Sequence, residues 1–267
     1  MCLLFHCRDA HSRYPFILLA NRDEFYERPT RSAEFWADAP GVLAGRDLRR
    51  GGTWLGITRS GRWAALTNFR EPSDASFERS RGDIVRAYLT GERGAREFAA
   101  DLAHTAQDFD GFNLLFGDLG VSLWLSNRGD GLQSLGAGVY GLSNHLLETP
   151  WPKVVAGKRS LAAQLEGELV ADRLFQPLAD RRVHDRDLPD TGAGPELERM
   201  LSSAFISSPH YGTRSSTLIM VNREGQVYFE ERTYDNRTGG SIGPDEYCSK
   251  TFQFRLDCED GGNRGMT

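Results

Sequence analysis

Met1-Cys2-Leu3-Leu4-Phe5 opens the chain, and Asn21-Arg22-Asp23-Glu24 ends the stretch of sequence that decides the fold. The residues between them predict a β-hairpin, with strands over 2–8 and 14–21 and a turn over 9–13. In an antiparallel pair folded about residue 11 or 12, Cys2 lies opposite Asn21. The hairpin therefore brings the polar residues that leave the second strand to the start of the chain.

Cys2 is the first candidate for chemistry. If Met1 is removed, Cys2 carries both a thiol and a free α-amine. The amine titrates near 7.7–8.0 and a free thiol near 8.5, so moving the proton between them costs only about 1 kcal/mol. This is the N-terminal arrangement of covalent catalysis, in which one residue supplies both nucleophile and base. The alternative is that Cys2 is a small buried hydrophobic residue.

Composition indicates an ordinary globular chain. Its 267 residues are 39% hydrophobic and 26% charged, and we predict one domain over 1–256 with a flexible tail over 257–267. The net charge of −5 gives no general argument for nucleic acid. No apolar run approaches the roughly 20 residues of a membrane span, and the start of the chain lacks the pattern of a secretory signal.

The cysteines and histidines bear on location and cofactors. Four cysteines in a chain of this length favour reduced thiols and a cytoplasmic location. The six histidines are scattered without a metal-binding pattern, so neither a metal nor an organic cofactor is expected.

The hydrophobic pattern predicts an α+β chain whose sheets are covered by helices. Further strands are expected over residues 41–45, 51–58, 63–68, 111–116, 121–126, 138–142, 216–221 and 226–231. Helices are expected as two short segments between 83 and 105, and over 153–165, 169–178 and 196–205. Residues 24–40 are polar and rich in turn formers, and predict a loop.

Several motifs occur together in this order. They are Met-Cys2, Asn21-Arg22-Asp23-Glu24, Gly-Gly-Thr-Trp-Leu-Gly at 51–56, Thr67-Asn68-Phe69-Arg70, Gly141-Leu142-Ser143-Asn144 and Tyr211-Gly212-Thr213-Arg214-Ser215-Ser216-Thr217. The set resembles the NRDE family, also called the transport and Golgi organisation protein 2 family, over nearly the whole chain to about residue 250. That family in turn resembles the cysteine branch of the N-terminal-nucleophile hydrolases, which includes bile-salt hydrolase and penicillin V acylase.

The resemblance implies a four-layer αββα sandwich and a set of site residues. The matching catalytic positions are Cys2, Arg22, Asp23, Asn144 and Arg214. The enzymes usually read Arg-Asn-x-Asp where this chain reads Asn-Arg-Asp-Glu, so the match of Arg22, Asp23 and Glu24 is open by one residue. Candidate substrate-binding residues are Asn21, Glu24, Gly52, Trp54, Asn68 and His145.

Each candidate also has a structural interpretation. Arg22 and Asp23 either activate the chain start or form a salt bridge that closes the hairpin. Asn68 and Asn144 end expected strands, where an amide donates to an oxyanion or simply suits a turn. Arg214 either clamps an anionic group or is a solvated surface residue.

Two functional hypotheses follow. The first is an N-terminal-nucleophile amidohydrolase or acyltransferase that uses Cys2 on an amide or thioester of a small acyl compound. The second is a non-catalytic binding or trafficking protein for a lipid-like, acyl-CoA or haem ligand in the same pocket, as the family resemblance allows. The sequence is compatible with an oligomer in either case.

Overall fold

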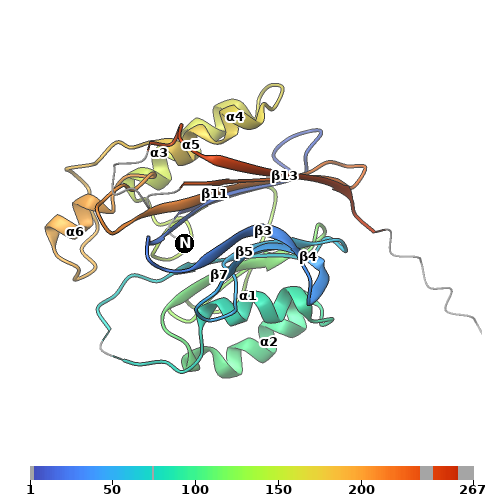
Figure 1. Ribbon diagram of the computed structural model, residues 1–267, viewed down its shortest axis with the longest axis horizontal. Coiled ribbons are helices and arrows are strands. Elements are labelled where there is room, and N and C mark those ends of the chain that lie inside the picture. Colours follow the sequence, from blue (N-terminus) through green and yellow to red (C-terminus); the bar gives the residue numbers. More distant parts are fainter. Residues whose placement is uncertain (1–2, 74, 235–242, 258–267) are drawn as a thin grey trace, which may run out of the picture.

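Two antiparallel sheets lie face to face in the computed structural model, which describes residues 3–73, 75–234 and 243–257. Helices cover the outer face of each sheet, so the layers follow the order helix, sheet, sheet, helix (Figure 1). The α+β class and the four-layer αββα sandwich expected from the sequence are confirmed.

The first sheet has six strands in the order β10-β1-β2-β11-β12-β13. Every neighbouring pair is antiparallel, and the central pair of β2 with β11 is the longest. The bounds are β1 (Leu3–Arg8), β2 (Phe16–Phe25), β10 (Gly138–Leu142), β11 (Tyr211–Val221), β12 (Gln226–Thr233) and β13 (Cys248–Arg255).

The second sheet has seven strands, which follow one another in chain order as an antiparallel meander. The bounds are β3 (Thr30–Trp36), β4 (Ala39–Asp47), β5 (Leu55–Thr58), β6 (Trp63–Asn68), β7 (Phe112–Gly117), β8 (Ser122–Ser126) and β9 (Gln133–Leu135).

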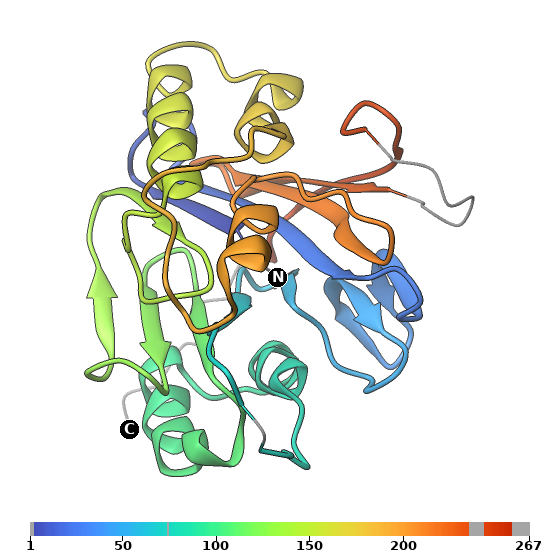
Figure 2. The same ribbon diagram turned by 90° about the vertical axis from the view of Figure 1, so that its left-hand side faces the viewer.

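The helices lie against the outer faces of the two sheets (Figures 1 and 2), and their buried apolar residues pack there. The seven-stranded sheet is covered by α1 (Arg81–Thr90) and α2 (Ala95–Thr105), followed by a 3-10 turn at Ala106–Asp108. The six-stranded sheet is covered by α3 (Pro152–Gln164), α4 (Ala171–Leu174) and α5 (Gln176–Ala179), while α6 (Pro195–Met200) lies towards one end. The start of α1 is fixed by a capping box between Ser80 and Asp83.

The hydrophobic core has three main parts. One fills the space between the two sheets, and the other two lie between each sheet and its helices. This follows from the period of two in a strand, because alternate side chains of one strand enter different layers. In β1, for example, Leu4 packs between the sheets whereas Leu3 and Phe5 pack under the helices.

The hairpin at the start of the chain is confirmed, but its expected register is wrong by one residue. Leu3, not Cys2, pairs with Asn21, because β2 begins only at Phe16, which pairs with Arg8. The second strand also continues to Phe25, where the sequence predicted an end at Asn21. The tetrad 21–24 is therefore part of a strand that pairs with β11, and it is not a loop that leaves the sheet.

Other differences concern edge strands and helix lengths. The expected loop over 24–40 contains β3, and neither β9 nor β13 was predicted. The expected helix over 196–205 ends at Met200, and the one over 169–178 is divided into α4 and α5. Cys2, Cys258 and nearly all of the expected tail 257–267 lie outside the described residues.

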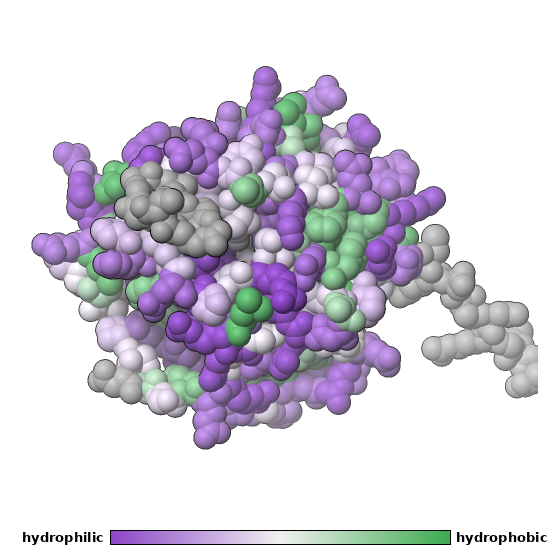
Figure 3. All heavy atoms as spheres, viewed as in Figure 1, coloured by the Kyte–Doolittle hydropathy of each residue, from purple (hydrophilic) through white to green (hydrophobic). Residues whose placement is uncertain are grey.

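The surface is predominantly polar. On the face shown in Figure 3, hydrophobic residues form small separate areas within a mostly hydrophilic surface. Within the described ranges, no helix has the length and apolar character that crossing a membrane requires.

Candidate active site

A polar pocket of about 110 Å³ lies where the end of β2 meets β6 and the start of α1. We call it the polar pocket; it is lined by Arg22, Glu24, Arg28, Asp47, Thr53, Trp54, Leu66, Asn68, Ser80, Arg81 and Gly82. Four of the residues selected from the sequence, namely Arg22, Glu24, Trp54 and Asn68, thus share one cavity.

Arg22 is the most unusual of these side chains. It is 4% exposed, and its guanidinium carbon lies 4.3 Å from the centre of the Trp54 ring. Its Nη2 approaches the Glu24 carboxylate at 3.9 Å, whereas no described residue accepts a hydrogen bond from its Nη1. Burial lowers the pKa of Arg22 to about 10, although the nearby Glu24 carboxylate opposes that shift. A buried cation with an unpaired donor favours an anionic partner in the pocket.

A second unpaired polar atom lies in the adjacent strand. Ser215 pairs with Arg22 across β2 and β11, and among the described residues its buried Oγ has no hydrogen-bond partner. Native proteins seldom leave such atoms unpaired without a functional reason or a bound water. Two buried polar atoms without a hydrogen-bond partner among the described residues thus belong to paired residues of β2 and β11.

Asp23 points to the other face of the sheet. Its Oδ1 accepts a hydrogen bond of 2.6 Å from the hydroxyl of Thr213, and its buried Oδ2 has no partner among the described residues. Arg22 instead forms its ion pair with Glu24. The salt bridge between Arg22 and Asp23 that the sequence left open is therefore not present, because neighbouring residues of a strand face opposite sides.

Asn21 also faces the helices. Its Nδ2 donates to the carbonyl oxygens of Leu178 and Ala204, both at 2.8 Å, and its Oδ1 accepts from Ser216 at 2.6 Å. These bonds join β2 to the segment that covers it. Its expected contact with a substrate stays a prediction, and ligand binding would have to displace one of these bonds.

The two candidate oxyanion donors differ in their bonding. Nδ2 of Asn144 donates to the carbonyl oxygen of Asn68 at 3.0 Å, and Oδ1 of Asn144 accepts from Arg70 at 3.3 Å. The side-chain amide of Asn68, by contrast, has no hydrogen-bond partner among the described residues. Asn68 is half-buried and lines the polar pocket, so its amide is the one available to a ligand.

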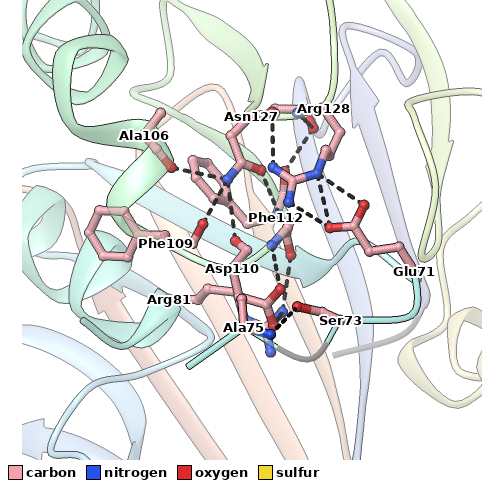
Figure 4. Close-up of polar contacts among 12 residues, drawn as sticks. Glu71, Ser73, Ala75, Arg81, Ala106, Phe109, Asp110, Phe112, Asn127 and Arg128 are labelled. Carbon is pink, nitrogen blue, oxygen red and sulfur yellow. Dashed lines mark hydrogen bonds and ion pairs between the residues drawn. The ribbon is translucent and has the colours of Figure 1, made fainter. Parts of the chain in front are cut away.

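A second, wider pocket of about 400 Å³ adjoins the first and is mostly apolar. We call it the apolar pocket; it is lined by Phe25, Asn68, Phe69, Arg70, Glu71, Arg81, Asp110, Asn144, Leu197, Met200, Leu201 and Tyr211. The two pockets share Asn68 and Arg81. Arg81 is held at this junction by Asp110 at 2.8 Å and the carbonyl oxygen of Gly111 at 3.0 Å (Figure 4).

Arg214 and His145 lie apart from both pockets. Nη1 of Arg214 donates to the carbonyl oxygens of Phe25 and Arg28, each at 3.0 Å, and the residue lines a different cavity. Nδ1 of His145 lies 3.0 Å from the hydroxyl of Thr149, and burial lowers the pKa of this imidazole. Neither residue lines the polar pocket with Arg22, although the charge of Arg214 is near enough to contribute to the lowered pKa of Arg22.

Gly52 serves the packing of α1. A Cβ atom on Gly52 would lie 2.5 Å from the carbonyl carbon of Gly82, so glycine here lets the first turn of α1 approach the loop between β4 and β5. The close backbone approach that the glycines predicted does occur, but the approaching group is a helix.

Arg28, Asp47 and Arg81 line the polar pocket, although sequence reasoning did not select them. Nη2 and Nε of Arg28 donate to one oxygen of Asp47 at 2.5 and 3.0 Å. The capping signal at Ser80 locates the start of α1, but no sequence signal places that helix end beside β2.

Comparison with known proteins identifies the chain's relatives. The family model described as Transport and Golgi organisation 2 matches residues 1–236. The chain belongs to the Transport and Golgi organisation 2 family. It is 38% identical to the Transport and Golgi organization protein 2 homolog of Bos taurus, over 96% of this chain and 99% of that one. The Homo sapiens homolog is 37% identical over the same shares of both chains.

The fold of this family member can be compared with that of a solved structure. The Caenorhabditis elegans ortholog of N-acylethanolamine-hydrolyzing acid amidase aligns with a TM-score of 0.51 at 11% sequence identity, over 82% of this chain and 92% of that one. The fold is therefore that of the N-terminal-nucleophile hydrolases.

Proposed function

We propose that the protein is an amidohydrolase or acyltransferase in which Cys2, exposed by loss of Met1, attacks an amide or thioester of a small acyl compound. The observation that carries the proposal is the junction of the two pockets at Asn68 and Arg81. The polar pocket is lined by the buried Arg22, whose Nη1 has no hydrogen-bond partner among the described residues, and by the free amide of Asn68. It adjoins an apolar space suited to an acyl chain. We also propose that residues 1–256 form a single domain.

In the first step, the α-amine of Cys2 takes the thiol proton and the sulfur bonds to the carbonyl carbon. The carbonyl electron pair moves to oxygen, where the amide of Asn68 donates to the oxyanion. Such a donor contributes about 2.7–4 kcal/mol to the transition state. The bond from carbon to the leaving nitrogen or sulfur then breaks, and the amine returns its proton to the leaving group.

In the second step, water or another acceptor attacks the acyl-cysteine, which releases the acyl product and regenerates the thiol. Arg22 would stabilise the thiolate and the oxyanion through its charge. Asp23, on the helix side, would act on the site through Thr213 and β11. Arg214 would act through its charge, since it contributes to the lowered pKa of Arg22.

A non-catalytic binding protein is the second candidate. It is favoured by the bonding of Asn144, whose amide is occupied by Asn68 and Arg70 and not free for an oxyanion. In this case the apolar pocket would hold a lipid-like, acyl-CoA or haem ligand, and Arg22 would pair with its anionic group.

We also propose a cytoplasmic location, supported by free cysteines. Cys7 and Cys248 are both unpaired, which suits a reducing compartment. Burial raises the pKa of the Cys7 thiol to about 12, so this thiol is unreactive at neutral pH and serves as an internal control for labelling.

The test is acylation by an electrophilic acyl probe, mapped by peptide mass spectrometry. We expect label at Cys2 in protein whose intact mass shows loss of Met1, with Cys7 unlabelled. Cys2→Ala should abolish turnover of an amide and thioester panel, whereas Cys248→Ala, which removes an exposed thiol, should keep it. A retained Met1, or turnover that survives Cys2→Ala, would refute the catalytic proposal. Ligand binding that survives Cys2→Ala without turnover in the wild type would favour the second candidate.

A further inference from the structure

A third cavity next to the polar pocket is surrounded by arginine. It measures about 270 Å³, and we call it the arginine pocket. Among the described residues it is lined by one carboxylate, Asp110, and by five arginines, Arg28, Arg49, Arg50, Arg79 and Arg81, together with Ala75, Phe77 and Ser80. The whole chain has a formal charge of −5, so this concentration of positive charge is local.

Two of these arginines lack a neutralising partner. Arg28 pairs with Asp47, Arg79 with Asp108 and Arg81 with Asp110. Within the described ranges, Arg49 and Arg50 form no ion pair; Nη2 of Arg50 donates instead to the carbonyl oxygen of Glu78. That bond joins the loop after β4 to the segment before α1, and so keeps the guanidinium groups on the two sides of the cavity together.

The other arginines are held in place by their own contacts. Arg79 lies over the Phe109 ring at 4.4 Å and bonds to Asp108 at 3.3 Å. Figure 4 shows Arg81 directed at Asp110, while Asn127 binds the carbonyl oxygens of Ala106, Phe109 and Asp110 and so fixes the loop that carries this carboxylate. Guanidinium groups gathered around a cavity favour a planar or tetrahedral oxyanion.

A second observation, in the adjoining polar pocket, also favours an anionic ligand. The arginine pocket shares Arg28, Ser80 and Arg81 with the polar pocket, where the buried Arg22 has its unpaired Nη1. The amino end of α1, a helix of ten residues, begins at the shared wall, and its partial positive charge adds to the same field.

We infer that the arginine pocket binds the phosphate or diphosphate group of a phosphate ester whose remainder extends into the adjoining pockets. Guanidinium groups bind phosphate oxygens with two parallel hydrogen bonds, and several of them together match a doubly charged group. This binding does not depend on Cys2 as nucleophile, so the inference stands whether or not the proposed reaction occurs.

Calorimetric titration of the full chain with inorganic pyrophosphate tests the inference. We expect saturable binding by the wild type and equal binding by Cys2→Ala. The triple variant Arg49→Ala, Arg50→Ala, Arg79→Ala should bind at least about tenfold more weakly, because it loses charge-assisted hydrogen bonds. The matched control removes three exposed arginines that line none of these pockets, Arg96→Ala, Arg173→Ala and Arg255→Ala, and should stay within about twofold because distant charges are screened.

Hydrogen exchange on the unmodified protein gives a second measurement that needs no variant. Pyrophosphate should slow exchange in peptides that cover 47–52 and 78–83. Titration with ADP then tests for a soluble phosphate ester, and flotation with phosphatidic acid vesicles tests for a lipid headgroup. Binding in either experiment that depends on Arg49, Arg50 and Arg79 supports the inference. Equal losses in the triple variant and its control, or no protection of either peptide, would overturn it.

Discussion

Replacing Arg22 by methionine separates the ligand-binding and structural roles of the polar pocket. Methionine keeps a long side chain against Trp54 but removes the charge and all donors. An unpaired buried donor costs about 1–3 kcal/mol, which the substitution relieves. The lost stacking on Trp54 is worth about 0.5–2 kcal/mol, and the pair with Glu24, at 3.9 Å, at most about 1 kcal/mol. These terms nearly cancel, so the free energy of unfolding should change by less than about 1 kcal/mol.

The functional effect should be large by comparison. Without the guanidinium, the pocket loses the charge proposed to stabilise a thiolate and an oxyanion. We therefore expect labelling of Cys2 by the acyl probe at pH 7 to slow by about tenfold or more. Urea unfolding followed by far-ultraviolet circular dichroism measures the stability, and time-resolved intact mass measures the labelling.

Arg28→Met is the matched control in the same pocket. Arg28 is bonded to Asp47, so its loss leaves this partly buried carboxylate without its ion pair and, among the described residues, with only the backbone N–H of Arg49 as a donor. This should destabilise the fold by about 1–3 kcal/mol. A loss of about 2 kcal/mol or more in Arg22→Met, equal to the effect at Arg28, would show that Arg22 is part of the structural network. Unchanged labelling in Arg22→Met would refute its proposed role in the site.

Three further predictions concern Glu231 in β12, the pair Asn68 and Asn144, and Gly52. Burial raises the pKa of Glu231 to about 7, so the stability gained from its protonated form is fully present below its ordinary pKa and is lost as the pH rises through 7. In urea unfolding, the wild type should therefore lose stability relative to Glu231→Gln between about pH 4.5 and 7. Parallel pH profiles of the two proteins would contradict this prediction. Asn68→Ala should lower kcat by about a hundredfold with little change in melting temperature. Asn144→Ala should instead lower the free energy of unfolding by about 1–3 kcal/mol. The reverse pattern would indicate that Asn144, and not Asn68, donates to the oxyanion. Gly52→Ala should cost about 1–3 kcal/mol, since its Cβ would lie 2.5 Å from the backbone of Gly82, and an unchanged thermal midpoint would show that α1 shifts freely.

The layers of this fold were predictable where the strands are buried. The buried segment 63–68 has bounds that agree with the structure, because its apolar residues and flanking turns define it. The edge strand at 138–142 also has the expected bounds. β3 and β13 lie at sheet edges and are half polar, and their conformation comes from pairing with β4 and β12 rather than from their own sequences.

The site was predictable only in part, for a related reason. Arg22 and Asn68 are adjacent to recognisable motifs, so the sequence placed them near strand ends. Arg49 and Arg50 lie in the loop after β4, Arg79 lies in the segment before α1, and the two segments line one cavity. Gly52, in the same loop as Arg49 and Arg50, packs against Gly82 of α1. Local sequence carries no signal for a contact of this kind.

The strand β2 determines which way the four side chains of residues 21–24 point. Because successive side chains alternate between faces, Arg22 and Glu24 enter the polar pocket while Asn21 and Asp23 face the helices. The buried amide of Asn21 and the carboxylate of Asp23 bind partners in the segment 178–213, which fixes the height and tilt of β2. That anchoring is what allows a buried arginine to keep an unpaired donor, since a mobile strand would let the guanidinium turn to water. The four residues therefore form one unit, in which the helix-side pair holds the pocket-side pair in the polar pocket.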